Sequence, residues 1–187
     1  VLLALGDTLE TPMLELRLGV VGASGAGKSA LITRFCEDSF SEGQGAGRCA
    51  RELKLGGESV LLVLNELSTS DMDAGDLGEP PEGFLIVVQS CSDDAVSVWE
   101  QCVRIAGTQD VPAVLVCTKS DVTPVSLEKG RELAAKLPAP FFTVSAKTGE
   151  NVDAAFLELA KEIKRRQPPP KEEEKKKPES DDSCSIS

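Results

Sequence analysis

A glycine-rich run at residues 22–29 constrains this chain more than any other feature of its sequence. The run reads Gly22-Ala23-Ser24-Gly25-Ala26-Gly27-Lys28-Ser29, which matches the pattern G-x-x-x-x-G-K-[ST]. It follows a strand-like alternation at residues 14–21 and precedes a helical pattern at residues 30–35. Backbone N–H groups of such a loop, with the helix dipole, attract a phosphate. We therefore predict a phosphate-binding loop, with Lys28 on the β- and γ-phosphates and Ser29 on Mg²⁺.

The composition excludes several other classes of site. The chain has no histidine, which excludes His-based catalytic triads and His-containing zinc sites. Its formal net charge of −11 argues against a nucleic-acid-binding surface. The six cysteines include no C-x-x-C pair, and we expect them to be reduced thiols in or near the core. They are Cys36, Cys49, Cys91, Cys102, Cys117 and Cys184.

The order of apolar patterns predicts the fold class. Residues 84–88, 114–117 and 141–144 are continuous apolar runs, as expected of parallel strands covered on both faces. Helical patterns lie between them and after them. We predict an α/β fold, with a doubly wound, mostly parallel six-stranded sheet and flanking helices, whose ligand site lies at the carboxyl ends of the strands.

Two further strands and the helices complete the predicted order. Residues 51–55 and 60–64 have strand-like patterns, and Gly56-Gly57 between them is a hairpin turn signal. The remaining helical patterns lie at about residues 93–106, 125–137 and 152–163, with Asn151 as the expected cap of the last helix.

The composition changes near both ends of the chain. Residues 1–13 form an N-terminal extension whose apolar start lacks a basic segment, so it is a poor secretory signal. Residues 14–166 form the predicted domain. Residues 167–187 begin with Gln167 and a triple proline and continue as a Lys/Glu-rich tail with little to bury, which predicts disorder.

Two more motifs select the base that accompanies the phosphates. Thr118-Lys119-Ser120-Asp121 directly follows one of the apolar runs. A carboxylate at Asp121 can accept hydrogen bonds from guanine N1–H and the exocyclic amine. Adenine lacks both of these donors, and its N1 is itself an acceptor. Ser145-Ala146-Lys147 follows the next apolar run and supplies a backbone N–H for the guanine carbonyl oxygen. The sequence therefore favours guanine over adenine.

With these three motifs in order, residues 14–166 resemble the Ras superfamily of small GTPases. The resemblance implies GTP and GDP as ligands, Mg²⁺ as cofactor, and a guanine site made by Phe40, Thr118, Lys119, Asp121, Ser145, Ala146 and Lys147. It also implies protein effectors or regulators that bind through residues 39–83. We expect a cytoplasmic monomer that acts in signalling or membrane traffic and does not bind nucleic acid.

The chain departs from the family pattern where the γ-phosphate would be recognised. Residues 41–49 contain no threonine to match the one that binds Mg²⁺ in the family's first switch. Glu66 replaces the aspartate that supports the metal through water, Thr69 replaces a glycine, and Ser70 replaces the water-orienting glutamine. These departures are similar to those of the GTPase-like domains of centaurin-gamma proteins. We expect weakly held Mg²⁺ and slow or absent hydrolysis, and the catalytic residue is unknown.

The last four residues are a candidate lipidation signal. Cys184-Ser185-Ile186-Ser187 fits C-a-a-X, and the terminal serine favours a farnesyl group, although Ser185 is not aliphatic. One lipid gives only weak, reversible attachment. We expect peripheral association with the cytoplasmic face of a membrane; the alternative is a solvated tail with an incidental cysteine.

Two alternative functions remain open from the sequence. The first is a pseudo-GTPase that serves as a protein-interaction module. The second is a P-loop ATPase or nucleotide kinase. It fits less well because such proteins carry an arginine-bearing lid, for which this chain has little room, and lack a guanine-selecting aspartate. The stretch between Lys54 and Arg104 is acidic without a basic residue, which suits either a basic partner or a solvated face.

Overall fold

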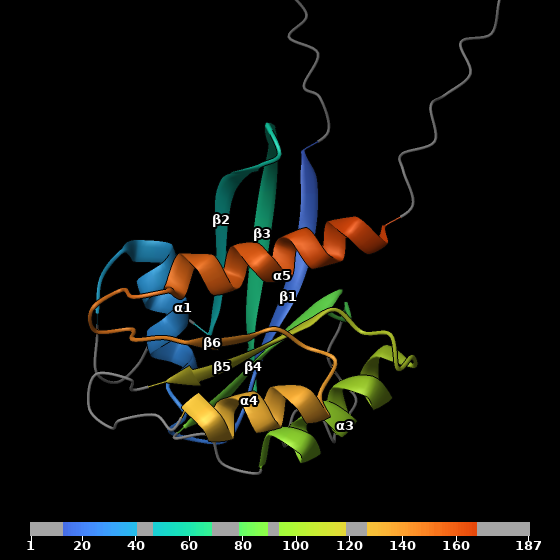
Figure 1. Ribbon diagram of the computed structural model, residues 1–187. Coiled ribbons are helices and arrows are strands. Elements are labelled where there is room, and N and C mark those ends of the chain that lie inside the picture. The colour runs from blue at the N-terminus through green and yellow to red at the C-terminus, as the bar shows by residue number, and fades with distance from the viewer. Residues whose placement is uncertain (1–12, 41–46, 69–78, 90–93, 119–126, 168–187) are drawn as a thin grey trace, which may run out of the picture.

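Six strands form a single sheet in the order β2-β3-β1-β4-β5-β6 (Figure 1). The structure is a computed structural model, and it describes residues 13–40, 47–68, 79–89, 94–118 and 127–167. The strands are β1 (Leu14–Val21), β2 (Arg48–Leu55), β3 (Glu58–Leu67), β4 (Gly83–Gln89), β5 (Ala113–Thr118) and β6 (Phe141–Thr143). β2 pairs antiparallel with β3, and every other pairing between described strands is parallel. The predicted α/β fold is confirmed.

Four described helices cover the two faces of this sheet. They are α1 (Lys28–Glu37), α3 (Asp94–Ala106), α4 (Leu127–Lys136) and α5 (Val152–Arg166). α1 and α5 pack over one face, and Phe35 of α1 meets Phe156 of α5 with ring centroids 4.3 Å apart. α3 and α4 pack over the other face, as Figure 1 shows below the sheet.

Strand β4 shows why a continuous apolar run predicts a central strand. Leu85 and Val87 are buried in the core beneath α1 and α5. Phe84, Ile86 and Val88 alternate with them and are buried in the core beneath α3. Because successive side chains point to opposite faces, both sets must be apolar when helices cover both sides.

The predicted hairpin is confirmed, and its strands are longer than the sequence indicated. Gly56 and Gly57 adopt positive φ angles of 65° and 92°, the conformation that a tight hairpin turn requires. β2 begins three residues earlier than expected, at Arg48, and its side chains alternate between exposed and partly buried. An edge strand with one solvated face carries polar residues, which obscured its amino-terminal half in the apolar pattern.

The start of α5 differs in one respect from the prediction. Asn151 occupies the cap position with φ of 56°, but its side chain makes no capping hydrogen bond. Its Nδ2 instead donates to the Thr143 carbonyl oxygen at 2.9 Å. Asn151 is therefore the N-cap residue as predicted, but its side chain connects the start of α5 to the end of β6 and does not cap the helix.

The expectation of reduced cysteines is wrong for one pair. A disulfide joins Cys36 in the last turn of α1 to Cys49 in β2. Cys102 and Cys117 are buried thiols outside that disulfide, and burial raises the pKa of the Cys102 thiol to about 12. Cys91 and Cys184 lie outside the described residues.

Predictions for both ends of the chain concern residues that the structure does not describe. The N-terminal extension and the lipidation signal at Cys184 lie outside the described residues. α5 ends at Arg166, with Gln167 as its C-cap. Within the described ranges, no helix has the length and apolar character required to cross a bilayer.

Candidate functional site

The phosphate loop joins the carboxyl end of β1 to the first residue of α1. Gly22, Gly25 and Gly27 have positive φ angles of 150°, 76° and 98°. A Cβ at Gly22 would lie 2.1 Å from the Val87 carbonyl oxygen, so no other residue fits there. The Ala26 N–H donates to the Ala23 carbonyl oxygen at 3.2 Å and closes a turn. The glycines thus let the loop curl tightly over the end of the sheet.

Lys28 holds its charge inside this loop. Its side chain is only 6% exposed, and Nζ donates to the carbonyl oxygens of Gly22 at 3.0 Å and Ala23 at 3.1 Å. An ammonium group that has lost most of its water is a strong partner for a phosphate oxygen. The placement is that expected of a lysine that binds phosphates.

Ser29 lies at the first turn of α1 and contacts Glu66 near the end of β3. The Ser29 Oγ–H donates to Glu66 Oε2 at 2.7 Å, and Glu66 Oε1 lies 3.8 Å from Lys28 Nζ. β1 and β3 bring these groups together, because Val20 pairs with Glu66 in the sheet. The sequence placed Glu66 near the metal through water and did not predict this direct contact.

The Ser29 and Glu66 oxygens fit the requirements of Mg²⁺. The ion prefers hard oxygen ligands and is commonly bound by one or two carboxylates together with substrate phosphates and water. The hydroxyl and the carboxylate meet beside a buried lysine at a helix N-terminus, where phosphate is also favoured. The donor set is thus consistent with a magnesium ion shared with a nucleotide.

Thr118 anchors the phosphate loop from the end of β5. Its side chain is 4% exposed, and Oγ1 donates to the Ala26 carbonyl oxygen at 2.6 Å. The same hydroxyl lies 3.4 Å from the Val88 carbonyl oxygen of β4. Because a hydroxyl has one proton, Thr118 acts first as a positioning residue for the loop. Its predicted contact with guanine remains a prediction, and Lys119 and Asp121 lie outside the described residues.

The turn after β6 is held by its own hydrogen bonds. Ser145 is buried, and its N–H donates to the Glu150 carbonyl oxygen at 3.2 Å. Ser145 Oγ accepts from the Thr148 N–H at 3.2 Å, while Ala146 packs against the core and Lys147 is exposed. Because the Ser145 N–H already donates to the Glu150 carbonyl oxygen, we expect the predicted hydrogen bond to guanine to come from a neighbouring backbone amide of this turn.

The three motifs meet at the carboxyl ends of the parallel strands. The phosphate loop follows β1, Thr118 ends β5, and Ser145 comes soon after β6. These strands run parallel to one another or to shared neighbours, so their carboxyl ends lie on the same side. The Val144 N–H donates to the Cys117 carbonyl oxygen at 2.9 Å, which fixes the last two motifs together. This is the edge at which a doubly wound sheet binds ligands.

The remaining predicted site residues are only partly described. Phe40 follows α1 and is 39% exposed, so its ring is free to meet a planar group. Ser24 is exposed on the phosphate loop. Ser70 and Thr69 of the second switch and residues 41–46 of the first switch lie outside the described residues.

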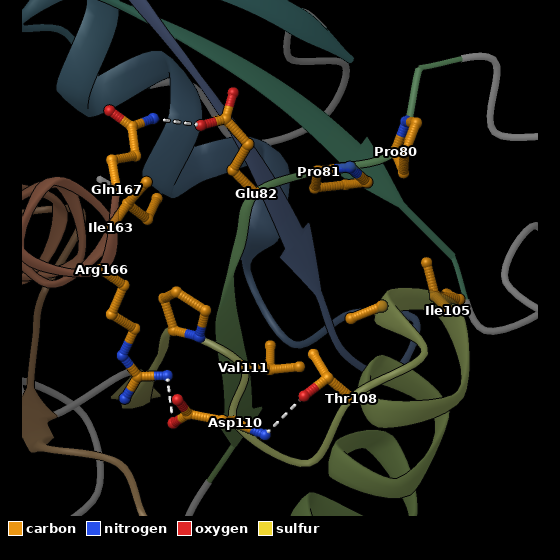
Figure 2. A pocket seen from close by; sticks show the side chains of 12 residues that line it. Pro80, Pro81, Glu82, Ile105, Thr108, Asp110, Val111, Ile163, Arg166 and Gln167 are labelled. Carbon is orange, nitrogen blue, oxygen red and sulfur yellow. Dashed lines mark hydrogen bonds and ion pairs between the residues drawn. The ribbon is translucent and has the colours of Figure 1, made fainter. Parts of the chain in front are cut away.

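A hollow of about 500 Å³ lies near the amino ends of β4 and β5. It is lined by residues that precede β4 and β5 and by the end of α5, and Figure 2 shows Gln167 hydrogen-bonded to Glu82 and Arg166 paired with Asp110. The amino ends of parallel strands lie away from the phosphate loop. This hollow is therefore separate from the candidate site.

The chain is similar in sequence to one family model and to known proteins. The Ras family model matches residues 82–165. GTP-binding protein ypt2 of Schizosaccharomyces pombe is 31% identical over 170 residues, covering 81% of this chain and 82% of that protein. Ras-related protein SEC4 of Candida albicans (strain WO-1) is 34% identical over 164 residues, covering 81% of this chain and 78% of that protein.

Proposed function

Because the chain belongs to the Ras superfamily of small GTPases, we propose that it binds GDP and GTP and hydrolyses GTP slowly or only with a partner protein. The reaction would convert GTP and water to GDP and phosphate. The observation that carries the proposal is the enclosed Lys28 ammonium in the glycine-rich loop, beside the Ser29–Glu66 pair.

The phosphate contacts follow from the loop geometry. Lys28 would exchange its carbonyl partners for oxygens of the β- and γ-phosphates, and amides of residues 22–29 would donate to the phosphates. Ser29 and Glu66 would hold Mg²⁺, which supplies positive charge that offsets the charge of the phosphates. A nucleotide would therefore be bound largely through its diphosphate.

The base is proposed to be guanine. Asp121 would accept from the guanine edge with Lys119 beside it, and an amide of the Ser145–Lys147 turn would donate to the carbonyl oxygen. Phe40 would cover one face of the ring from the end of α1. A carboxylate that meets adenine in this place would face an acceptor, so ATP should bind poorly.

Hydrolysis is proposed to be slow because the residues that would orient water are absent from the sequence. Ser70 stands in place of the glutamine, and Thr69 in place of the glycine. Phosphoryl transfer depends almost entirely on positioning and electrostatic stabilisation. The rate should therefore lie below the intrinsic rate of Ras, about 10⁻⁴ s⁻¹ in order of magnitude.

A pseudo-GTPase remains the second candidate, and one observation favours it. The Glu66 carboxylate partners both Ser29 and Lys28. A charge network that is satisfied by itself reduces the gain from binding a magnesium nucleotide. In that case the family's partner-binding region, residues 39–83, would act as an interaction surface independent of nucleotide.

We also propose a weak, peripheral membrane association through a farnesyl group on Cys184. The C-terminal sequence supports this, and a single lipid gives reversible attachment. The chain would act at the cytoplasmic face of a membrane, in signalling or membrane traffic. Mass spectrometry of the C-terminal peptide from eukaryotic cells tests the modification, with Cys184→Ser as the control.

The nucleotide content of the purified protein tests the function most directly. We expect GDP or GTP in the extract, tight binding of both, and no competition by ATP. A folded protein that is empty and does not bind added guanine nucleotides would support the pseudo-GTPase. Adenine nucleotide in the extract would overturn the guanine assignment. A single-turnover assay at or above the intrinsic Ras rate would contradict slow hydrolysis.

A further inference from the structure

The Cys36–Cys49 disulfide connects two elements that flank the candidate site. Cys36 lies in the last turn of α1, whose first turn carries Lys28 and Ser29. Cys49 is the second residue of β2 and pairs with Leu64 of β3. The bond closes a segment with a sequence separation of 13 residues. It therefore links the helix that presents the phosphate ligands to the edge of the sheet.

From Cys49, printed contacts lead back to the phosphate loop. Gly47 lies two residues before Cys49, and its carbonyl oxygen accepts a hydrogen bond from the Glu66 N–H at 2.7 Å. The carboxylate of the same Glu66 accepts from Ser29 Oγ at 2.7 Å. The position of the β2 terminus thus bears directly on the residue proposed to hold Mg²⁺.

We propose that Cys36 and Cys49 form a reversible redox site whose disulfide stabilises the Gly47–Glu66 contact. With glutathione disulfide as oxidant, the Cys36 and Cys49 thiols lose two protons and two electrons, one protein S–S bond forms, and two glutathione thiols are released. Reduction by glutathione reverses the exchange through a mixed disulfide. Disulfides in reducing compartments are commonly of this transient kind.

The surroundings of the two cysteines suit exchange with a small thiol. Both are partly exposed, so a glutathione molecule can approach them. Cys102, by contrast, is fully buried, and burial raises its pKa to about 12. It stays a thiol and does not compete for oxidation.

Opening the disulfide removes one covalent restraint on the first residues of β2, an edge strand. The Gly47–Glu66 hydrogen bond should then open more often, because terminal residues of edge strands exchange through local unfolding. If the proposed nucleotide site is correct, a less fixed Glu66 supports Mg²⁺ less well and GDP leaves faster. This last consequence rests on the proposed function, whereas the effect on the Glu66 amide does not.

The first experiment follows the disulfide itself. The full chain is equilibrated in glutathione buffers from fully reduced to fully oxidised, free thiols are alkylated, and the peptides carrying Cys36 and Cys49 are quantified by mass spectrometry. We expect a single reversible transition between two alkylated cysteines and one linked pair. A pair that stays thiol in every buffer, or stays linked in every buffer, would overturn the proposal.

The second experiment measures hydrogen exchange of the Glu66 amide in both redox states by nuclear magnetic resonance. We expect reduction to speed exchange by about two- to tenfold, the range for weakening one hydrogen bond. The amide of Leu115, a buried residue of β5, donates to the Pro140 carbonyl oxygen at 2.8 Å and is the internal control. The double variant C36S/C49S should exchange at the reduced rate in both buffers. Equal Glu66 exchange in the oxidised and reduced protein refutes the coupling.

GDP release with Mg²⁺ present separates the two proposals. We expect release to be about two- to tenfold faster from reduced protein, matching the amide effect, and unaffected by redox state in Glu66→Gln. Measurable but equal release rates would remove the link to the nucleotide and leave GDP binding intact. Absence of GDP binding in both states would defeat the proposed function, and the amide exchange would still decide the redox site.

Discussion

The phosphate loop and the β2–β3 edge approach the same candidate site but are held in different ways. The loop is tied by Lys28 to two of its own carbonyl oxygens and by Thr118 to β5, and both side chains are buried. The β2–β3 edge reaches the site through Glu66, whose side chain is 23% exposed. The phosphate loop, which would bind the diphosphate, is thus held by buried side chains. The proposed support of the metal from β3 depends on the Glu66 carboxylate.

This difference fits the division in the sequence. The residues predicted to bind phosphate are complete, while the residues that would recognise the third phosphate are replaced around Glu66, Thr69 and Ser70. The buried hydrogen bond from Thr118 to the Ala26 carbonyl oxygen is costly to break, so the loop should keep its shape with or without ligand. A partly exposed carboxylate can change partners at little cost. Diphosphate binding therefore rests on a more rigid structure than recognition of the γ-phosphate does.

The largest effect should come from removing the charge within the loop. Lys28→Ala should weaken GTP binding by about 100-fold or more and GDP binding by about tenfold or more, because charge-assisted hydrogen bonds contribute roughly 1.5–3 kcal/mol each and GDP lacks the γ-phosphate contact. Isothermal titration calorimetry measures both affinities. Lys161→Ala is the matched control, since Lys161 is 55% exposed on α5 and pairs with Glu158 in its own helix. A loss below about threefold would show that the loop does not bind phosphates.

A smaller loss should follow when the anchor of the loop is removed. Thr118→Val keeps the side-chain shape but leaves the Ala26 carbonyl oxygen without its 2.6 Å partner. An unsatisfied buried acceptor costs roughly 1–3 kcal/mol, so GDP and GTP affinity should both fall by about tenfold. Thr118→Ser should retain most of the affinity. Thr108→Val, near the opposite edge of the sheet, serves as control, and selective loss of GTP binding would contradict a purely positional role.

At the β2–β3 edge we expect an effect on metal dependence and little on the diphosphate. Glu66→Gln removes the charge that faces Ser29 and Lys28, so GTP binding should depend less on Mg²⁺. The ratio of GTP affinity with Mg²⁺ to GTP affinity with a chelator should be about fivefold smaller than in the wild type. The measurement is GTP affinity with Mg²⁺ and with a chelator. Glu66→Asp separates the carboxylate from Ser29 by one methylene and should preserve the metal dependence.

Glu58→Gln provides the matched control for this prediction. Glu58 lies at the start of the same strand and pairs with Lys164 on the surface. It should leave the metal dependence of GTP binding unchanged. If Glu66→Gln behaves like Glu58→Gln, the Ser29–Glu66 contact has no part in holding the metal, and the pseudo-GTPase becomes the better description.

Much of the fold was predictable because local periodicity reports it directly. The apolar run of β4 and the glycine pair between β2 and β3 each depend on neighbours in the sequence. The Ser29–Glu66 contact was not predictable, because it joins residues 37 apart and depends on the register of β1 against β3. Family comparison indicated Glu66 as a substitution but not its partner.

The incorrect cysteine prediction and the unpredicted contact of Asn151 have a similar origin. The Cys36–Cys49 pair depends on where α1 ends and where β2 begins, and the latter was placed three residues too late. Asp38 ends the helix with a left-handed φ of 51°, a turn that the sequence pattern did not reveal. Asn151 has the right residue type for a cap, but its amide is used by the end of β6. Such partners are chosen by tertiary packing and not by residue type.

The smallest effect on nucleotide binding should come from the outer attachment of β2. Arg51 donates to the Phe35 carbonyl oxygen and pairs with Asp153 at 2.9 Å, and its guanidinium carbon lies 4.6 Å from the Phe35 ring centroid. Arg51→Ala should reduce the free energy of unfolding by about 1 kcal/mol, since exposed ion pairs and cation–π contacts contribute little. The thermal midpoint should fall by about 2–4 °C.

The decisive quantity for this variant is the ratio of two effects. GDP affinity should stay within about twofold of the wild type while the midpoint falls, because the loop is anchored by Thr118 and not by β2. Arg165→Ala, which removes a pair confined to α5, should change neither value. If Arg51→Ala weakens GDP binding as strongly as it lowers stability, the edge strand and the phosphate loop unfold as one unit. Phosphate binding by the loop would then depend on the stability of β2 and β3, the strands proposed to support the metal.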